Sequence, residues 1–103
     1  MSAIFEFEDY KKFVQSWIKA SPSGGHGKYR EIAKALSAHT TTISQVFNGE
    51  KDLTIEQAHL MAEFLGFNAL ETRYFLLLVQ LERAGTHRLK LYYKKEIGEV
   101  RDA

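Results

Sequence analysis

Residues 40–48 carry short polar side chains at a spacing that suits the recognition of another molecule. If the segment is helical, steps of three and four residues place four of them on one face: Thr41, Ser44, Gln45 and Asn48. Serine and threonine are poor helix formers on an exposed surface, so we infer that these side chains are retained for what they contact. In the major groove of DNA, a glutamine amide can bond adenine through two hydrogen bonds, and a threonine methyl group can contact thymine.

The threonines at the start of this segment also admit a simpler interpretation. Residues 40–42 are all threonine, and a threonine hydroxyl can accept a hydrogen bond from the first backbone amides of a helix. On this interpretation the threonines only cap the helix and form the turn before it.

Two short helical patterns are expected to position the polar face, one in residues 28–36 and the other in residues 40–48. In the first pattern three apolar residues share one side, and the small alanine allows another helix to approach closely: Ile32, Ala33 and Leu36. In the second pattern three apolar residues oppose the polar face: Ile43, Val46 and Phe47. The apolar sides should therefore pack inward, while the polar face of residues 40–48 points outward.

The residues before these patterns predict one helix and a connection. Apolar residues recur at helical spacing through residues 8–20, which indicates an amphipathic helix. Residues 21–27 contain the only proline of the chain and three glycines, and we expect them to form a flexible linker.

The residues after these patterns predict further helices and no strand. Residues 54–84 should supply two supporting helices, because Thr54 and Asn68 each begin a capping box. A last helix is expected at residues 87–99. The sequence therefore predicts an all-α fold, a compact bundle of five to six short helices in one domain that spans residues 1–103.

The composition indicates a folded protein with no strong overall attraction to nucleic acid. Fourteen lysine and arginine residues oppose thirteen aspartate and glutamate residues, so DNA binding would have to depend on a local surface. The absence of cysteine excludes disulfides and thiolate metal sites. The acidic start of the chain is unlike a signal peptide, and the apolar run of residues 74–79 is too short to span a membrane. We therefore expect a cytoplasmic protein.

Residues 28–66 resemble the helix-turn-helix region of the Cro and phage-repressor superfamily. The similarity lies in Ile32-Ala33, a short turn, Ile43-Ser44 and Val46-Phe47-Asn48-Gly49, then in Leu53-Thr54-Ile55 and Ala62-Glu63-Phe64-Leu65-Gly66. This resemblance implies a lambda-repressor-like fold, in which the helix-turn-helix of residues 28–48 reads the major groove. It also implies a sequence-specific bacterial transcriptional regulator.

Two further stretches resemble a narrower family of bacterial regulator-like proteins. They are residues 4–13 and residues 74–79. Longer members of that family join such a domain to a larger C-terminal domain. The resemblance therefore implies that this chain is either a short relative or a fragment.

The chain departs from the superfamily pattern at two positions. Ser37 stands where the superfamily usually has glycine, and a left-handed backbone there costs a residue other than glycine about 1 to 2 kcal/mol, so the turn is expected to differ in detail. Gln45 stands where the superfamily often has a basic residue. Strong reading of guanine by this segment is therefore not expected.

The resemblance implies roles for individual side chains. Four would contact bases: Thr40, Thr41, Ser44 and Gln45. Five would contact or approach phosphates: Lys28, Tyr29, Arg30, Asn48 and Lys51. Phosphate contacts would position the protein on DNA without specifying the sequence. Taken singly, each of the three cations is better explained as a solvated surface residue.

No catalytic, metal or cofactor site is predicted, and we expect no enzyme. His59 and Glu63 are spaced to share a metal ion, but a third ligand is missing. The other histidines are isolated: His26, His39 and His87. The glycines of residues 24–27 lack the preceding strand and the Gly-Lys-Ser/Thr sequence of a phosphate-binding loop, and no serine lies in a nucleophile elbow.

The expected partners are double-stranded DNA and a second copy of the chain. Apolar residues cover most of the circumference of residues 70–81, which indicates either the centre of the monomer core or a subunit contact. The last helix could complete the core or pair across a two-fold axis through Leu89, Leu91, Tyr92, Tyr93 and Ile97. A dimer would read two half-sites about 34 Å apart, one turn of DNA.

Two other functions remain open at this point. One is a protein-interaction module with the same helix-turn-helix shape but no DNA binding, which the balanced charge and the absence of lysine and arginine from residues 40–48 favour. The other is the antitoxin of a toxin–antitoxin pair, which would bind both DNA and a protein partner.

Overall fold

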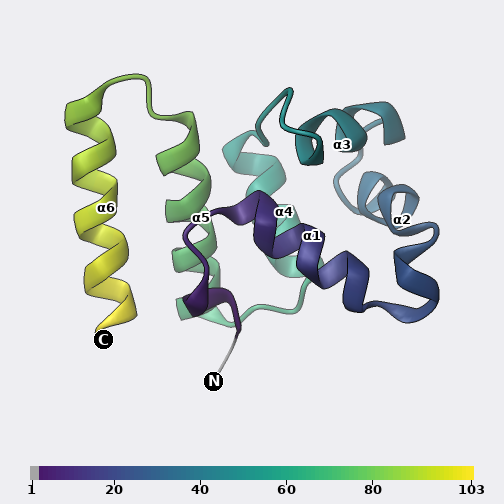
Figure 1. Cartoon of the computed structure of the whole chain (residues 1–103), viewed down its shortest axis with the longest axis horizontal. Helices are drawn as coiled ribbons and strands as arrows, with labels where there is room; N and C mark the ends of the chain where they lie inside the picture. The colour runs from purple at the N-terminus through teal and green to yellow at the C-terminus, as the bar shows by residue number, and fades with distance from the viewer. Residues whose placement is uncertain (1–2) are drawn as a thin grey trace.

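The computed structural model describes residues 3–103, which form six α-helices and two short 3-10 helices without a strand (Figure 1). The α-helices are α1 (Tyr10–Ala20), α2 (Lys28–Ala35), α3 (Thr40–Phe47), α4 (Ile55–Phe64), α5 (Ala69–Arg83) and α6 (His87–Arg101). The 3-10 helices are η1 (Ala3–Glu6) and η2 (Pro22–Gly25). The predicted all-α fold of short helices is confirmed.

Side chains cap the first turns of several helices. The carboxylate of Asp9 accepts hydrogen bonds from the backbone amides of Lys11 and Lys12 at the start of α1. The capping boxes predicted at Thr54 and Asn68 are both confirmed, at the starts of α4 and α5. In each box the cap and the residue three positions later bond one another's backbone amides, which would otherwise lack a partner.

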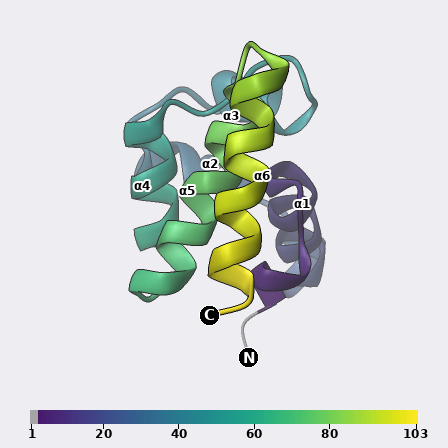
Figure 2. The ribbon, with the colours of Figure 1, turned by 90° about the vertical axis from the view of Figure 1, so that its left-hand side faces the viewer.

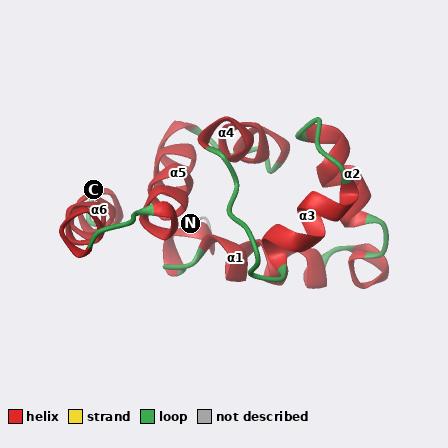
Figure 3. Cartoon of the chain, turned by 90° about the horizontal axis from the view of Figure 1, so that it is seen from above, coloured by secondary structure: helices red, strands yellow, loops and turns green. Residues whose placement is uncertain are grey.

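α5 lies at the centre of the molecule. It packs against α6 on one side and against α4, α1 and η1 on the other, an arrangement that is visible from above (Figure 3). Four of its side chains are buried: Tyr74, Phe75, Leu78 and Val79. The core of the monomer therefore explains these four residues, whereas Leu70 is 40% exposed and Leu76, Leu77 and Leu81 are only partly buried.

α6 and the α2–α3 pair lie at opposite ends of the longest dimension of the molecule, which is 37 Å (Figure 1). The side of α6 that faces α5 is buried through Ile97 and Val100. Tyr93 is half-buried and Leu89 is 40% exposed, so the apolar side predicted for the last helix is only partly covered.

Hydrogen bonds join the start of the described chain to its end. The Tyr74 hydroxyl donates to the carbonyl of Phe7 at 2.6 Å. The Arg101 guanidinium donates to the Tyr74 hydroxyl and to the carbonyl of Phe5, and it pairs with Glu8 at 3.5 Å. These contacts hold the first residues against the C-terminal end of α6.

Residues 21–27, predicted to be a flexible linker, connect α1 and α2 and contain a short 3-10 helix. Pro22–Gly25 forms the 3-10 helix η2, which packs against α1. A Cβ atom at Gly25 would lie 2.4 Å from Ile18 Cγ2, and the φ of Gly25 is +85°. Glycine is required here because the backbone lies directly against α1 in a conformation that other residues rarely adopt.

Candidate nucleic-acid interface

α2 and α3 are joined by residues 36–39, and their apolar faces point into the protein. All six residues predicted for those faces are buried: Ile32, Ala33, Leu36, Ile43, Val46 and Phe47. Backbone amides in the turn bond carbonyls at the end of α2, with Ala38 N to Ala33 O at 2.9 Å. Burial of the apolar side leaves the opposite side of α3 as the part of this helix that faces outward.

Ser37 adopts the left-handed conformation within this turn, with a φ of 52°. A residue other than glycine bears a steric cost in this conformation, and the tertiary structure holds it in place. That the turn differs from the superfamily pattern stays a prediction.

The polar face of α3 is accessible. Thr40, Thr41 and Asn48 are exposed, while Ser44 and Gln45 are half-buried. The Asn48 amide donates to the Ser44 hydroxyl at 3.2 Å, so these two side chains are held together. The four predicted base-contacting residues thus lie on α3, and Asn48 is its C-cap residue.

The interpretation of the threonines as a cap is wrong. His39 is the N-cap residue of α3, and no side chain caps this helix. In the part of the chain that the structure describes, the hydroxyls of Thr40 and Thr41 form no hydrogen bond. They remain available to another molecule.

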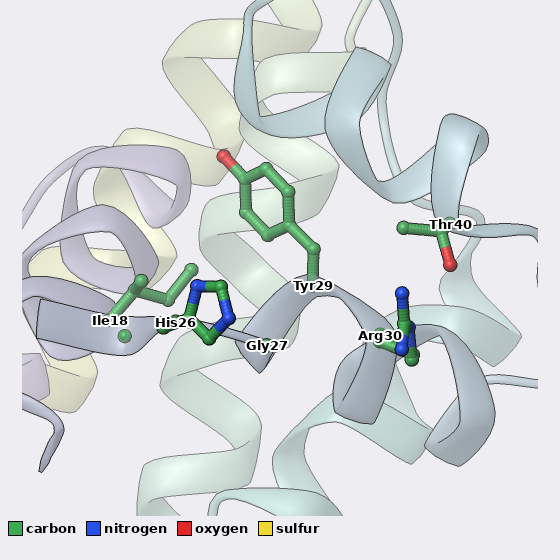
Figure 4. Close-up of a pocket in the computed structure, with 7 residues that line it drawn as sticks. Ile18, His26, Gly27, Tyr29, Arg30 and Thr40 are labelled. Atoms are coloured by element: carbon green, nitrogen blue, oxygen red, sulfur yellow. The ribbon is translucent and has the colours of Figure 1, made fainter. Parts of the chain in front are cut away.

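Arg30 lies beside the start of α3 and also has no acidic partner among residues 3–103. Arg30 and Thr40 lie together on one side of a hollow of about 360 Å³, and Ile18 and His26 line its opposite side (Figure 4). The guanidinium and the first turn of α3 can therefore contact the same ligand.

Two of the other predicted phosphate contacts are engaged within the protein. Lys28 Nζ lies 3.0 Å from Glu31 Oε2 and 5.2 Å from the centre of the Trp17 ring. The half-buried Tyr29 ring stacks on Phe47 with 6.3 Å between ring centres. Tyr29 thus connects the start of α2 to the buried side of α3.

Lys51 lies in the loop that follows α3, and its side chain is exposed. Its ammonium group has no acidic partner in the described chain, and its carbonyl accepts a hydrogen bond from Lys11 Nζ at 2.6 Å. Of the three predicted cations, Arg30 and Lys51 are thus the two that no carboxylate neutralises.

Three residues of α1 hold α3 and this loop, and sequence reasoning missed them. The Gln15 amide donates to the carbonyl of Phe47, the last residue of α3. The Tyr10 hydroxyl donates to Asp52 at 2.9 Å and accepts from the amide of Leu53 at 3.1 Å. Lys11 Nζ lies 3.2 Å from Asp52 Oδ1, so α1 fixes both the end of α3 and the loop after it.

Burial of Tyr10 raises the pKa of its hydroxyl well above the ordinary value. The hydroxyl therefore remains a hydrogen-bond donor throughout the neutral range. Tyr10 lies in the apolar stripe of α1, and a buried tyrosine hydroxyl needs a hydrogen-bond partner. This is the one feature of the sequence from which the contact could have been predicted.

Two histidines that the sequence left isolated lie close to the polar face of α3. His39 directly precedes α3, and His26 lines the hollow beside Arg30 and Thr40 (Figure 4). Both are exposed. They add imidazole groups to the end of the molecule that carries the predicted site.

The two residues spaced to share a metal ion and the apolar helices were also located in the structure. His59 Nδ1 lies 3.7 Å from Glu63 Oε1, and residues 3–103 contain no group of three or more histidines, cysteines or acidic residues able to hold a metal ion. Over the same residues, no helix has the length and apolar character needed to cross a membrane.

Comparison of the chain with models of protein families, with curated proteins and with solved structures gave no match. The resemblance to the Cro and phage-repressor superfamily therefore stays a prediction. The proposed function is therefore based on the geometry of α2 and α3.

Proposed function

We propose that this protein is a DNA-binding transcriptional regulator in which α2 and α3 act as a helix-turn-helix and α3 enters the major groove. The observation that carries the proposal is the two-sided character of α3. Its apolar side is buried, whereas its outer side presents hydroxyl and amide groups, of which Thr40 and Thr41 have no partner in the described chain. A helix of this kind can approach base edges closely, because its outer side chains are short.

The chemistry of the polar face favours a site that contains A·T pairs. Gln45 can form two hydrogen bonds with adenine, and the methyl groups of Thr40 and Thr41 can contact thymine. The Ser44 hydroxyl accepts from Asn48 and keeps its own hydrogen available for donation. α3 contains no lysine or arginine, the residues that most often read guanine.

Contacts to the DNA backbone would come from the residues around this face. Arg30 and Lys51 are exposed cations without an acidic partner in the described chain, which suits them to phosphates. Lys28 can join them, because an ion pair with an exposed glutamate contributes little and is easily exchanged.

The first experiment selects preferred sites from a random DNA pool with the purified chain and then measures the affinity of Gln45→Ala for the selected site. The variant should lose about 1 to 3 kcal/mol of binding free energy and discriminate less between sequences, while its unfolding midpoint stays unchanged. Gln80→Ala is the matched control, because Gln80 lies on α5 outside the α2–α3 unit. Unchanged affinity and preference in Gln45→Ala would show that α3 does not read bases.

The second experiment separates phosphate contacts from base contacts. Arg30→Ala should weaken binding to all sequences alike and should reduce the slope of log K against log salt by about 1. Lys90→Ala removes the same charge from α6, at the far end of the molecule, and should leave the slope unchanged.

A second candidate function is binding of a protein partner through the same face, either in a module that has lost DNA binding or in an antitoxin. The near balance of fourteen basic and thirteen acidic residues favours it, as does the absence of cations from α3. A salt titration with random-sequence DNA distinguishes the regulator from a module that has lost DNA binding, because a pure protein adaptor should show almost no salt-dependent affinity. An antitoxin would also bind DNA, and a toxin gene in the adjacent reading frame would identify it.

A further inference from the structure

α6 forms the outermost layer of the molecule and packs through one side only. Figure 2 shows it in front of α5, and Figure 3 shows its other side facing away from every other helix. Ile97 and Val100 cover α5, and Arg73 pairs with Glu96 at 3.8 Å. The opposite side of α6 has no covering element in the described chain.

Alternating steps of three and four residues along this side of α6 and its C-cap give a regular stripe: Arg88, Leu91, Lys95, Gly98 and Asp102. Gly98 is half-buried at the edge of a hollow that Leu81 also lines, and the other four are exposed. This spacing is the one by which a helix contacts a second helix along its length. Leu91 is 52% exposed, and the neighbouring Tyr92 is 57% exposed. Tyr92 is held in place by an edge-to-face contact with Tyr93, with 5.5 Å between ring centres.

Gly98 lies inside α6 and is not required by the monomer. A Cβ atom at this position would meet nothing within 4 Å, and the backbone there is helical. Alanine would fit and would favour the helix more strongly. A glycine at such a position is explained when another backbone or a large side chain approaches it closely.

The charges on this side are complementary to those of a second α6 in one orientation only. The basic residues of the stripe, Arg88 and Lys95, precede the acidic residues Glu99 and Asp102. In a parallel pair of helices like charges would meet. In an antiparallel pair Arg88 of each helix faces Glu99 and Asp102 of the other, and only Lys95, near the middle of the contact, meets a like charge.

We propose that α6 pairs antiparallel with α6 of a second copy of this chain, about a two-fold axis that passes close to Lys95. In this arrangement Leu91 of each copy packs on Gly98 of the other, and Arg88 faces Glu99 and Asp102 of the other. The contact is self-complementary, as a two-fold interface requires. This inference goes beyond DNA binding and does not depend on it.

Sedimentation velocity of the full chain over a wide concentration range, without DNA, tests the proposal. The chain should show a concentration-dependent equilibrium between monomer and dimer. Leu91→Glu should weaken dimerisation by about tenfold or more, because it places two buried carboxylates in the contact. Leu70→Glu is the control, since Leu70 is 40% exposed on α5, and it should leave the equilibrium unchanged.

A charge exchange tests the orientation of the two helices. Arg88→Glu and Asp102→Arg should each weaken dimerisation severalfold, and the double variant should restore it. Both residues are exposed, so the variants should fold, which circular dichroism checks. A chain that stays monomeric at all concentrations, equal effects of Leu91→Glu and Leu70→Glu, or no rescue in the double variant would each overturn the proposal.

Discussion

The outer faces of α3 and α6 lie at opposite ends of the molecule and differ in chemistry. α3 presents short uncharged groups, whereas α6 presents long charged side chains around Leu91 and Tyr92. Short hydroxyl and amide groups suit close contact with base edges. Charges of both signs around a large apolar residue suit contact with a protein surface that has an apolar patch and the opposite charges.

The two helices also differ in how the rest of the protein holds them. α3 packs against α2 and α1, and Gln15 and Tyr10 fix its last residue and the loop that follows. α6 rests on α5 and is tied to η1 by Arg101. Both helices have an accessible outer face, but α3 packs on two helices whereas α6 packs mainly on one.

The largest expected change in stability comes from removing a buried side chain beneath α3. Phe47→Ala should lower the free energy of unfolding by about 3 to 5 kcal/mol, because Phe47 is 1% exposed and lies between the rings of Tyr10 and Tyr29. Ile97→Ala should lower the free energy of unfolding by about 2 kcal/mol, because α6 can move toward α5 and fill part of the space. Urea unfolding monitored by circular dichroism measures both. Equal losses would show that α6 is as firmly embedded as α3.

Tyr10→Phe tests the support of α3 from α1. The variant leaves the amide of Leu53 without its acceptor and should lose about 1 to 3 kcal/mol of stability at pH 7, together with affinity for DNA. Tyr92→Phe is the control, because Tyr92 is exposed. Unchanged stability and DNA binding in Tyr10→Phe would mean that this contact does not position α3.

The stability difference between the wild type and Tyr10→Phe should also depend on pH. The pKa of Tyr10 is raised by burial in the folded protein, so unfolding releases its proton once the pH exceeds the ordinary value of 10.0. The advantage of the wild type should therefore be constant below pH 10 and should shrink above it. Urea unfolding at pH 7 and at pH 11 measures the difference.

The separation of DNA half-sites tests whether the two faces work together. The sequence suggested half-sites one turn apart. In one chain α3 and α6 lie at opposite ends (Figure 1), so a dimer joined through α6 should hold its two α3 helices far apart. Half-sites two turns apart, about 68 Å, should then bind about tenfold more tightly than half-sites one turn apart. Leu91→Glu should abolish this preference. A preference for one turn would indicate a different dimer.

The smallest expected effect concerns the turn before α3. Ser37→Gly should raise the free energy of unfolding by up to about 1 kcal/mol, because glycine adopts the left-handed conformation without steric cost. Ser23, with a φ of 59°, is a matched position outside the turn, and Ser23→Gly should give a similar gain. Thermal unfolding measures both. Destabilisation by Ser37→Gly would mean that its side chain contributes more than the strain costs.

Sequence reasoning succeeded where short-range rules apply. The capping boxes at Thr54 and Asn68 were predictable because each involves residues three positions apart. The two faces of α3 were predictable because helical periodicity separates Ile43 and Phe47 from Thr41. The resemblance proposed a role for the polar residues, and that role awaits the DNA-binding experiments.

Capping rules and helical periodicity could not predict contacts between residues that are distant along the chain. Tyr10 and Asp52 are 42 positions apart, and no pattern within α1 indicates that its residues hold the loop after α3. The left-handed Ser37 was likewise not predicted, because the conformation depends on how α2 and α3 pack and not on serine itself.

The sequence by itself determined where the helices begin and which of their sides are apolar, because capping and helical periodicity act over a few residues. Only the tertiary structure decided which apolar sides are covered. α5 and α6 both carry apolar residues, yet packing from several directions buries α5, while α6 is covered on one side and leaves Leu91 and Tyr92 exposed. Burial depends on neighbours that are distant along the chain, and the fold alone brings those neighbours together.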